Sequence, residues 1–360
     1  MATTTTQSDG RASTPGIGSK GRNAPAPGSR LAEAFEAVEH FPLLVESRER
    51  VIAACTAATA RVGELIEIVE ADVGLAISVL RFANRGGVTV GGVAGVPDAV
   101  DALKPSGVLA IAGTAPSFDF FESNGGWEPR PERFRVHALA TQRAGDQIGR
   151  AVGWAERDEL AVAALLHDVG RLVISRLHPG YKAYFDAVSR TPGQRLRDER
   201  EQLGIDHALV GGVLARRWNL PQRLAVAIER HHAEDADGLA AMVAAADMVA
   251  HYTNGEAISP DRLMAACDRI GLGPEALRDL LYELPLANSD AARISEPCPL
   301  SARELDVLRH LSEGMVYKQI ATEMHLSVST IRTHLHNVYG KIGAVDRAQA
   351  VLTARDRGWI

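Results

Sequence analysis

The sequence predicts an all-α protein built from one large helical domain followed by one small helical domain. Apolar residues recur at helical spacing along most of the chain, and aromatic residues make up only 5% of it. With 360 residues, the chain is too long for one ordinary hydrophobic core. We therefore expect at least two folding units and few strands.

Composition divides the chain into four segments. Residues 1–30 are dominated by Thr, Gly, Ser, Pro and Ala, which cannot bury enough apolar surface to offset the entropy lost on ordering, so a disordered tail is predicted. Residues 31–287 show helical patterns separated by short loops with Gly and Pro. Residues 288–298 have the composition of a linker, and residues 299–360 are predicted to form a separate C-terminal module.

Hydropathy and cysteine content indicate the compartment. No apolar run reaches the roughly eighteen residues that a membrane-spanning helix needs, and the first residues lack the basic-then-apolar order of a secretory signal. We therefore expect a cytoplasmic protein with no membrane partner. Cys55, Cys267 and Cys298 are far apart and form no CxxC pair, which argues against a disulfide framework and against a thiolate zinc site.

The net charge of −6 is unevenly distributed. Residues 299–360 contain eight Lys and Arg against six Asp and Glu, so the rest of the chain carries 31 basic and 39 acidic residues. The C-terminal module is thus weakly basic (+2) and the remainder is acidic (−8). Attraction to DNA phosphates would have to come from local placement of charges and from dimerisation rather than from overall charge.

The C-terminal module has the pattern of a helix-turn-helix unit. Ser301 and Glu304 form a capping box, and Gly314 ends the helix that follows. A second short helix is expected over residues 318–325, and Ser327 is expected to cap a third. The third helix would present polar side chains able to contact phosphates and base edges, namely Ser329, Thr330, Arg332, Thr333, His336 and Asn337.

The segments LSARELDVLRHLSEG, YKQIATEMHLSVSTIRTHLHNVYGKIG and DRAQAVLTARDRGWI closely resemble the LuxR-type helix-turn-helix family. The resemblance implies a four-helix domain that binds double-stranded DNA, with Arg332, Thr333 and His336 facing the major groove. It also implies contacts to the DNA backbone from Lys318, Thr330 and Lys341, and a homodimer surface on the last helix, residues 345–357. Arg332 and His336 depart from the commoner family residues, so the target sequence stays open.

Histidine and aspartate residues upstream recur in the order H, HD, H, HH, D, each next to helix-forming sequence. Imidazole and carboxylate ligands suit iron, manganese, zinc or nickel, and one Asp can bridge two such metals about 3.5–4 Å apart. His167 and Asp168 are expected on one helix, about 100° apart. A single histidine beside an apolar helix is usually structural, so the interpretation depends on the whole set: His137, His167, Asp168, His207, His231, His232 and Asp247.

The segments FRVHALATQRAGDQIG, AALLHDVGRLVISRL, LGIDHALVGGVLARRWNLP, AIERHH and AAADMVAHY resemble the HDOD family, a relative of the HD-superfamily phosphohydrolases. IEIVEADVGLAISVLRFAN resembles its helical N-terminal half. The resemblance covers residues 31–287 and implies an all-helical regulatory or output module. Carried over from the catalytic relatives, one metal would be held by His137, His167, Asp168 and Asp247, and a second by Asp168, His207, His231 and His232.

Three departures from the HD-GYP class, which hydrolyses cyclic di-GMP, argue against that activity. Arg171 stands where that class has Lys, residues 233–238 replace its GYP loop, and Arg133 stands where some relatives have a Glu ligand. If a metal pair forms, Arg171 would be the candidate catalytic residue, because its guanidinium can hold a phosphate oxygen. Binding of a nucleotide or cyclic dinucleotide without turnover is equally compatible.

Three functions follow from these patterns. The leading hypothesis is a DNA-binding regulator whose HDOD-like domain senses or relays a signal through a metal, a nucleotide or a partner. The first alternative is a metal-dependent phosphodiesterase of cyclic nucleotides coupled to a DNA-binding domain, and the second is a non-catalytic dimerisation scaffold.

Overall fold

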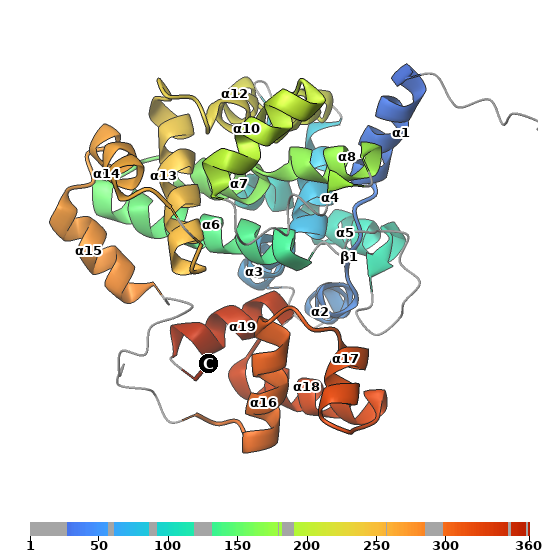
Figure 1. Ribbon diagram of the computed structural model, residues 1–360. Coiled ribbons are helices and arrows are strands. Elements are labelled where there is room, and N and C mark those ends of the chain that lie inside the picture. The colour runs from blue at the N-terminus through green and yellow to red at the C-terminus, as the bar shows by residue number, and fades with distance from the viewer. Residues whose placement is uncertain are drawn as a thin grey trace, which may run out of the picture.

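The computed structural model describes residues 27–56, 61–85, 92–118, 132–178, 180–181, 191–256, 258–284, 298–344, 347–357 and 359–360. These residues are almost entirely helical, and the prediction of an all-α protein is confirmed (Figure 1). Among them, no helix combines the length and the apolar character needed to cross a bilayer. Residues 1–26 of the predicted tail and residues 288–297 of the predicted linker lie outside the described part of the chain.

The described first part of the large domain contains five helices and a minimal parallel sheet, in which Leu43 pairs with Ser117 and Leu44 with Phe118. Its elements are α1 (Pro27–Glu39), β1 (Leu43–Leu44), α2 (Val45–Thr56), α3 (Val62–Ala71), α4 (Val73–Asn84), α5 (Val96–Thr114) and β2 (Ser117–Phe118). Helix α1 begins at Pro27, so the last four residues of the predicted tail are helical. Helix α5 is interrupted at Lys104, which has a φ of 60° and directly precedes Pro105.

The second part of the large domain continues the same hydrophobic core with helices that carry the predicted His/Asp set. They are α6 (Glu132–Val152), α7 (Arg157–Leu166), α8 (Val169–Leu177), α10 (Pro192–Leu203), α11 (His207–Arg217), α12 (Gln222–Arg230), α13 (Gly238–Thr253), α14 (Pro260–Arg269) and α15 (Pro274–Glu283). Local capping fixes several of these boundaries. Thr191 forms a capping box with Gln194 at the start of α10, and Asp206 caps α11 by accepting from the Leu209 amide.

A second hydrophobic core belongs to four C-terminal helices: α16 (Ala302–Ser312), α17 (Tyr317–Glu323), α18 (Val328–Ile342) and α19 (Arg347–Asp356). The predicted capping box of Ser301 and Glu304 is present at α16. Helix α19 also packs against α6 of the large domain, as Figure 1 shows, and its Leu352 is buried in the core of that domain. The two domains are therefore docked through α19.

Helices α8 and α11 approach each other closely at Gly170. A β-carbon at this position would lie 2.0 Å from the backbone oxygen of His207 and 2.7 Å from the amide nitrogen of Gly211. Only a residue without a side chain permits this crossing, which places the start of α11 against the start of α8.

We predict that Gly170→Ala lowers the free energy of unfolding by about 1–3 kcal/mol, because the backbone of α11 must move to admit a methyl group. Gly113→Ala is the matched control, since a β-carbon there meets nothing within 4 Å and the residue lies in a helix. The control should be neutral or slightly stabilising. Equal midpoints for both variants in urea unfolding followed by circular dichroism would contradict the close crossing.

Candidate functional site

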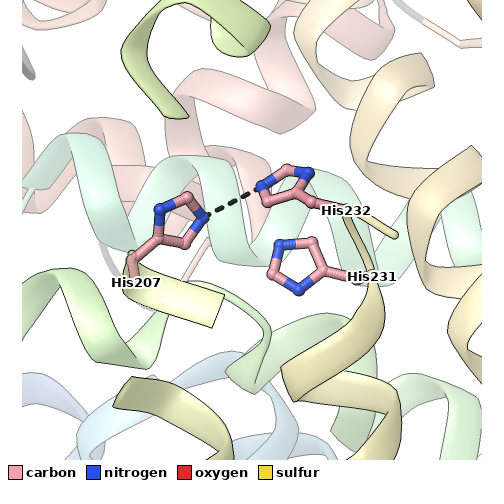
Figure 2. Close-up of side chains that lie close together, drawn as sticks. All are labelled: His207, His231 and His232. Carbon is pink, nitrogen blue, oxygen red and sulfur yellow. Dashed lines mark hydrogen bonds between the residues drawn. The ribbon is translucent and has the colours of Figure 1, made fainter. Parts of the chain in front are cut away.

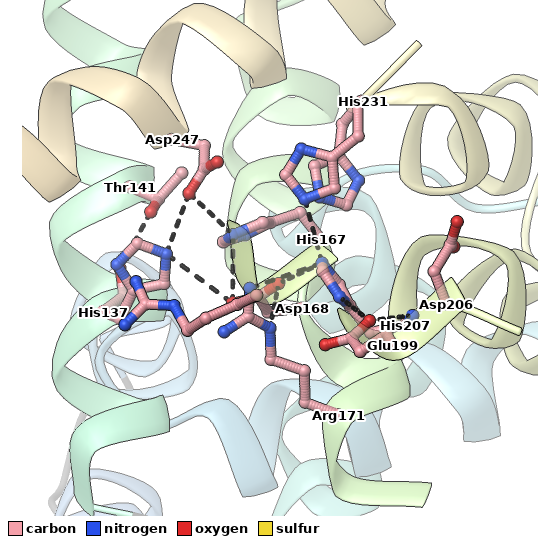
Figure 3. Close-up of polar contacts among 12 residues, drawn as sticks. His137, Thr141, His167, Asp168, Arg171, Glu199, Asp206, His207, His231 and Asp247 are labelled. Atoms are coloured by element: carbon pink, nitrogen blue, oxygen red, sulfur yellow. Dashed lines mark hydrogen bonds and ion pairs between the residues drawn. The ribbon is translucent and has the colours of Figure 1, made fainter. Parts of the chain in front are cut away.

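Two helix interiors and several helix ends bring the predicted His and Asp residues to one buried place. His137 projects from α6 and Asp247 from α13, whereas His207 is the first residue of α11. The expectation that His167 and Asp168 share one helix is wrong: α7 ends at Leu166, His167 is its C-cap, and Asp168 is the N-cap of α8. The break between the two helices allows both side chains to point toward the same centre (Figure 3).

One group of side chains gathers around Asp247. Its Oδ1 atom lies 2.9 Å from Nε2 of His137 and 3.4 Å from Nε2 of His167. Asp168 Oδ2 lies 3.6 Å from Nε2 of both histidines. His137, His167 and Asp247 thus offer three possible ligand atoms within 4.8 Å of one another.

A second group consists of His207, His231 and His232, whose rings face one another in Figure 2. The Nε2 atoms of His207 and His232 are 3.0 Å apart. Asp168 Oδ1 lies 3.1 Å from Nε2 of His207, so Asp168 stands between the two groups. The structure brings together all seven residues that the sequence predicted.

Burial and neighbouring charges together set the pKa values of the cluster. Burial lowers the pKa of His137 to about 4 and that of His231 to about 3. Burial alone would raise the pKa of Asp168, but the charge of Arg171 and the neighbouring histidines together outweigh it and hold this pKa well below its usual range. The carboxylate of Asp168 is therefore ionised, and Arg171 Nε lies 2.9 Å from its Oδ1 atom.

Two carboxylate or imidazole groups of the site were missed from the sequence. His251 Nε2 lies 3.1 Å from Asp247 Oδ1, and its ring stacks on that of His137 with centroids 4.3 Å apart. Its position four residues after Asp247 on α13 was a signal that could have found it. Glu199 Oε2 lies 2.6 Å from Nδ1 of His207, but α10 gives no local spacing that links it to the cluster.

The predicted DNA-contacting residues belong to α17 and α18 of the C-terminal domain. Ser327 caps α18 by accepting from the Thr330 amide, while Ile331, Leu335 and Val338 are buried on the opposite side. Thr330 is half-buried, and the exposed members of the predicted set are Lys318, Ser329, Arg332, Thr333, His336, Asn337 and Lys341. The Nζ atom of Lys341 already binds Glu304 Oε2 at 2.7 Å, so this lysine joins α18 to α16.

Comparisons with known proteins match both domains. Residues 41–234, more than half of the chain, match the family model of the HDOD domain. This chain belongs to the HDOD family. Residues 298–354 match the model described as bacterial regulatory proteins, luxR family. The chain therefore joins an HDOD domain to a DNA-binding domain of the LuxR regulator type.

Individual curated relatives match a short part of this chain. YxjL, an uncharacterized transcriptional regulatory protein of Bacillus subtilis, is 40% identical over 60 residues, which are 17% of this chain and 28% of YxjL. Response regulator RamR of Streptomyces coelicolor is 31% identical over 98 residues, 27% of this chain and 45% of RamR. The chain thus spans less than half the length of these curated relatives.

The crystal structure of the MmoQ response regulator from Methylococcus capsulatus covers 67% of this chain and 97% of MmoQ, with a TM-score of 0.53 and 23% sequence identity. At this identity the likeness concerns the fold alone.

The side-chain geometry of the HDOD domain suits a metal. Nδ1 of His167 donates to the Ala164 carbonyl at 2.7 Å, and Nδ1 of His231 donates to the Ile228 carbonyl at 2.6 Å. This leaves each Nε2 atom buried and without a hydrogen-bond partner. Metal-binding histidines are oriented in the same way, by a carbonyl or carboxylate on the other ring nitrogen. Glu199 supplies such a carboxylate to His207.

The His/Asp cluster of the HDOD domain opens on one side into a cavity of about 380 Å³. Its lining includes His231, His232 and Asp247 of the cluster together with Arg262 and Arg269 of α14. A negatively charged small molecule in this cavity would face both the cluster and two guanidinium groups.

Proposed function

We propose that this protein is a transcription regulator whose HDOD domain controls a DNA-binding domain in response to a signal. The observation that carries the proposal is the exposed polar surface of α18 within a luxR-type domain, from which Arg332, Thr333 and His336 can reach base edges. The partner would be double-stranded DNA, and Lys318, Ser329 and Thr330 would help to bind its backbone. Access to the chromosome favours the predicted cytoplasmic location.

Docking of α19 supports conditional DNA binding. The resemblance to LuxR-type proteins assigns the homodimer surface to this helix, and in the structure it packs against α6. Leu352 is buried in the core of the HDOD domain rather than in that of the C-terminal domain. Docking and dimerisation would therefore compete for α19, and a signal that weakens docking would promote binding to paired half-sites.

A divalent metal pair is the proposed cofactor of the HDOD domain, with iron, manganese, zinc and nickel as candidates. One metal would be held by His137, His167, Asp168 and Asp247, and the other by Asp168, His207, His231 and His232. His251 and Glu199 would orient these ligands through Asp247 and His207. Such a pair supplies Lewis acidity toward a bound phosphate when present.

A second candidate function, metal-dependent hydrolysis of a cyclic nucleotide, is favoured by the cavity beside His231 and His232. Arg262 and Arg269 in its lining suit phosphate oxygens. Arg171, the candidate catalytic residue, is buried and ion-paired with Asp168. Arg171 does not line this cavity, so it would act on the reaction through the Asp168 carboxylate that it stabilises. Turnover of cyclic mono- or dinucleotides by metal-loaded protein would establish this activity.

We predict that protein purified without oxygen contains one to two equivalents of a divalent metal, measured by inductively coupled plasma mass spectrometry. His167→Ala should abolish most of this content, because it removes a ligand. Glu199→Gln should weaken metal binding by about 10–100-fold, because the imidazole of His207 loses its charged partner.

His178→Ala is the control for metal content, since His178 is an exposed histidine outside the cluster. Metal-free wild-type protein that does not bind added manganese, iron, nickel or zinc would favour the non-catalytic scaffold instead.

We predict that Arg332→Ala combined with His336→Ala lowers specific DNA affinity by about ten- to a hundredfold or more, since a good base contact contributes about 1–3 kcal/mol. Fluorescence anisotropy with a site selected from random DNA measures the change. Arg278→Ala is the control, because this exposed arginine lies on α15 of the HDOD domain. Unchanged specific affinity in the double variant would contradict the role assigned to α18.

We predict that Leu352→Asn increases DNA affinity several-fold, because a polar group in the interdomain core weakens docking of α19. Leu352→Met is the matched control that keeps the apolar volume, and it should leave the affinity unchanged. The same anisotropy assay applies, and sedimentation velocity should show more dimer for Leu352→Asn. Lower DNA affinity in a folded Leu352→Asn protein would contradict competition between docking and dimerisation.

A further inference from the structure

A cavity of about 240 Å³ lies between the HDOD domain and the DNA-binding domain, on another side of the His/Asp cluster. The HDOD domain contributes α6, α8, α10 and the end of α13 to its lining. The DNA-binding domain contributes the end of α16 and one side of α19. This cavity exists only while the two domains are docked.

Arginines from both domains dominate the lining. The HDOD domain supplies Arg133, Arg171 and Arg195, and α19 supplies Arg347 and Arg355. Glu256 and Glu313 are the acidic residues of the lining, which leaves an excess of three positive charges. If Asp168, the partner of Arg171, is also counted, the excess is two. Like charges from two domains face one cavity and disfavour docking unless an anion lies between them.

Two of these guanidinium groups, one from each domain, have hydrogen-bonding capacity to spare. Arg355 is half-buried, and its Nη1 atom makes one long contact, 3.4 Å to Asn254 Oδ1. Burial lowers the pKa of Arg355, and within the described part of the chain no carboxylate forms an ion pair with it. Arg195 binds Glu256, but its buried Nε atom has no hydrogen-bond partner. Charged groups in this state bind an anion strongly.

We propose that the interdomain cavity binds a small molecule carrying a phosphate or diphosphate group, held by arginines of both domains. A guanidinium offers a planar pair of donors that matches phosphate oxygens, and a multiply charged phosphate balances an excess of two or three charges better than one carboxylate does. The remaining lining includes the apolar residues Val136, Leu311 and Val351, and its rings are the imidazoles of His137 and His251 rather than a Phe, Tyr or Trp side chain. The cavity therefore selects for the phosphate group.

Because the site lies between the two domains, its ligand would regulate DNA binding. This regulatory effect rests on the proposed function. An anion between Arg355 and the HDOD arginines stabilises the docked position of α19. Binding of the phosphate compound therefore keeps α19 from a second subunit and lowers DNA affinity. Loss of the compound favours separation of the two domains.

Isothermal titration calorimetry with inorganic pyrophosphate on the metal-free full chain tests the site without the metal centre. Arg133→Gln and Arg355→Gln, one in each domain, should each weaken binding about tenfold or more, because each removes a charge-assisted hydrogen bond. Arg303→Gln is the control, since Arg303 is an exposed arginine of the same C-terminal domain and outside the cavity lining. Circular dichroism confirms that each variant is folded.

Anisotropy then measures the effect on DNA. Pyrophosphate should lower the DNA affinity of the wild type several-fold relative to sodium chloride at equal ionic strength, and should not do so for Arg355→Gln. If the wild type does not bind pyrophosphate, the proposed site is wrong. The proposed site is also wrong if both glutamine variants bind pyrophosphate as tightly as the wild type does. If succinate binds as tightly as pyrophosphate, the assignment of the ligand to the phosphate class is wrong. A protein that binds pyrophosphate but no specific DNA overturns the proposed function and leaves the site standing.

Discussion

The ionised carboxylate of Asp168 is the constraint around which the HDOD domain is organised. A charge at the centre of a helical core is stable only if opposite charges and polar groups surround it. The break between α7 and α8 admits Asp168, and Arg171 one turn later neutralises it. The start of α11 must then approach closely enough to bring His207, which explains why α8 has a glycine at the crossing.

The sequence was sufficient to predict the helical class, the helix-turn-helix and the seven members of the His/Asp cluster. Periodicity and capping are local properties, so α16 and α18 began where Ser301 and Ser327 indicated. The helix break at His167 was not predicted, because an apolar run followed by Gly170 and Arg171 fits a continuous helix as well as an interrupted one. Glu199 and the docking of α19 depend on tertiary contacts that no local spacing reveals.

Two openings connect the cluster with the rest of the molecule. His251 contributes to the lining of both, one facing α14 and the other facing the DNA-binding domain. A change in charge or ligand at the cluster therefore has a short physical route through Glu256 and Arg195 to the interdomain cavity, which α19 also lines. Coupling through directly contacting charged groups requires no large rearrangement within the HDOD domain.

The two faces of α19 also have a consequence for assembly. One face completes the small core through Val351, and the other reaches the large core through Leu352. In the proposed competition between docking and dimerisation, the covalently attached HDOD domain acts as a partner present at an effective concentration of about a millimolar. A second subunit would have to compete with this concentration for the same helix. The proposed dimer would therefore depend on the fraction of undocked protein as well as on the total protein concentration.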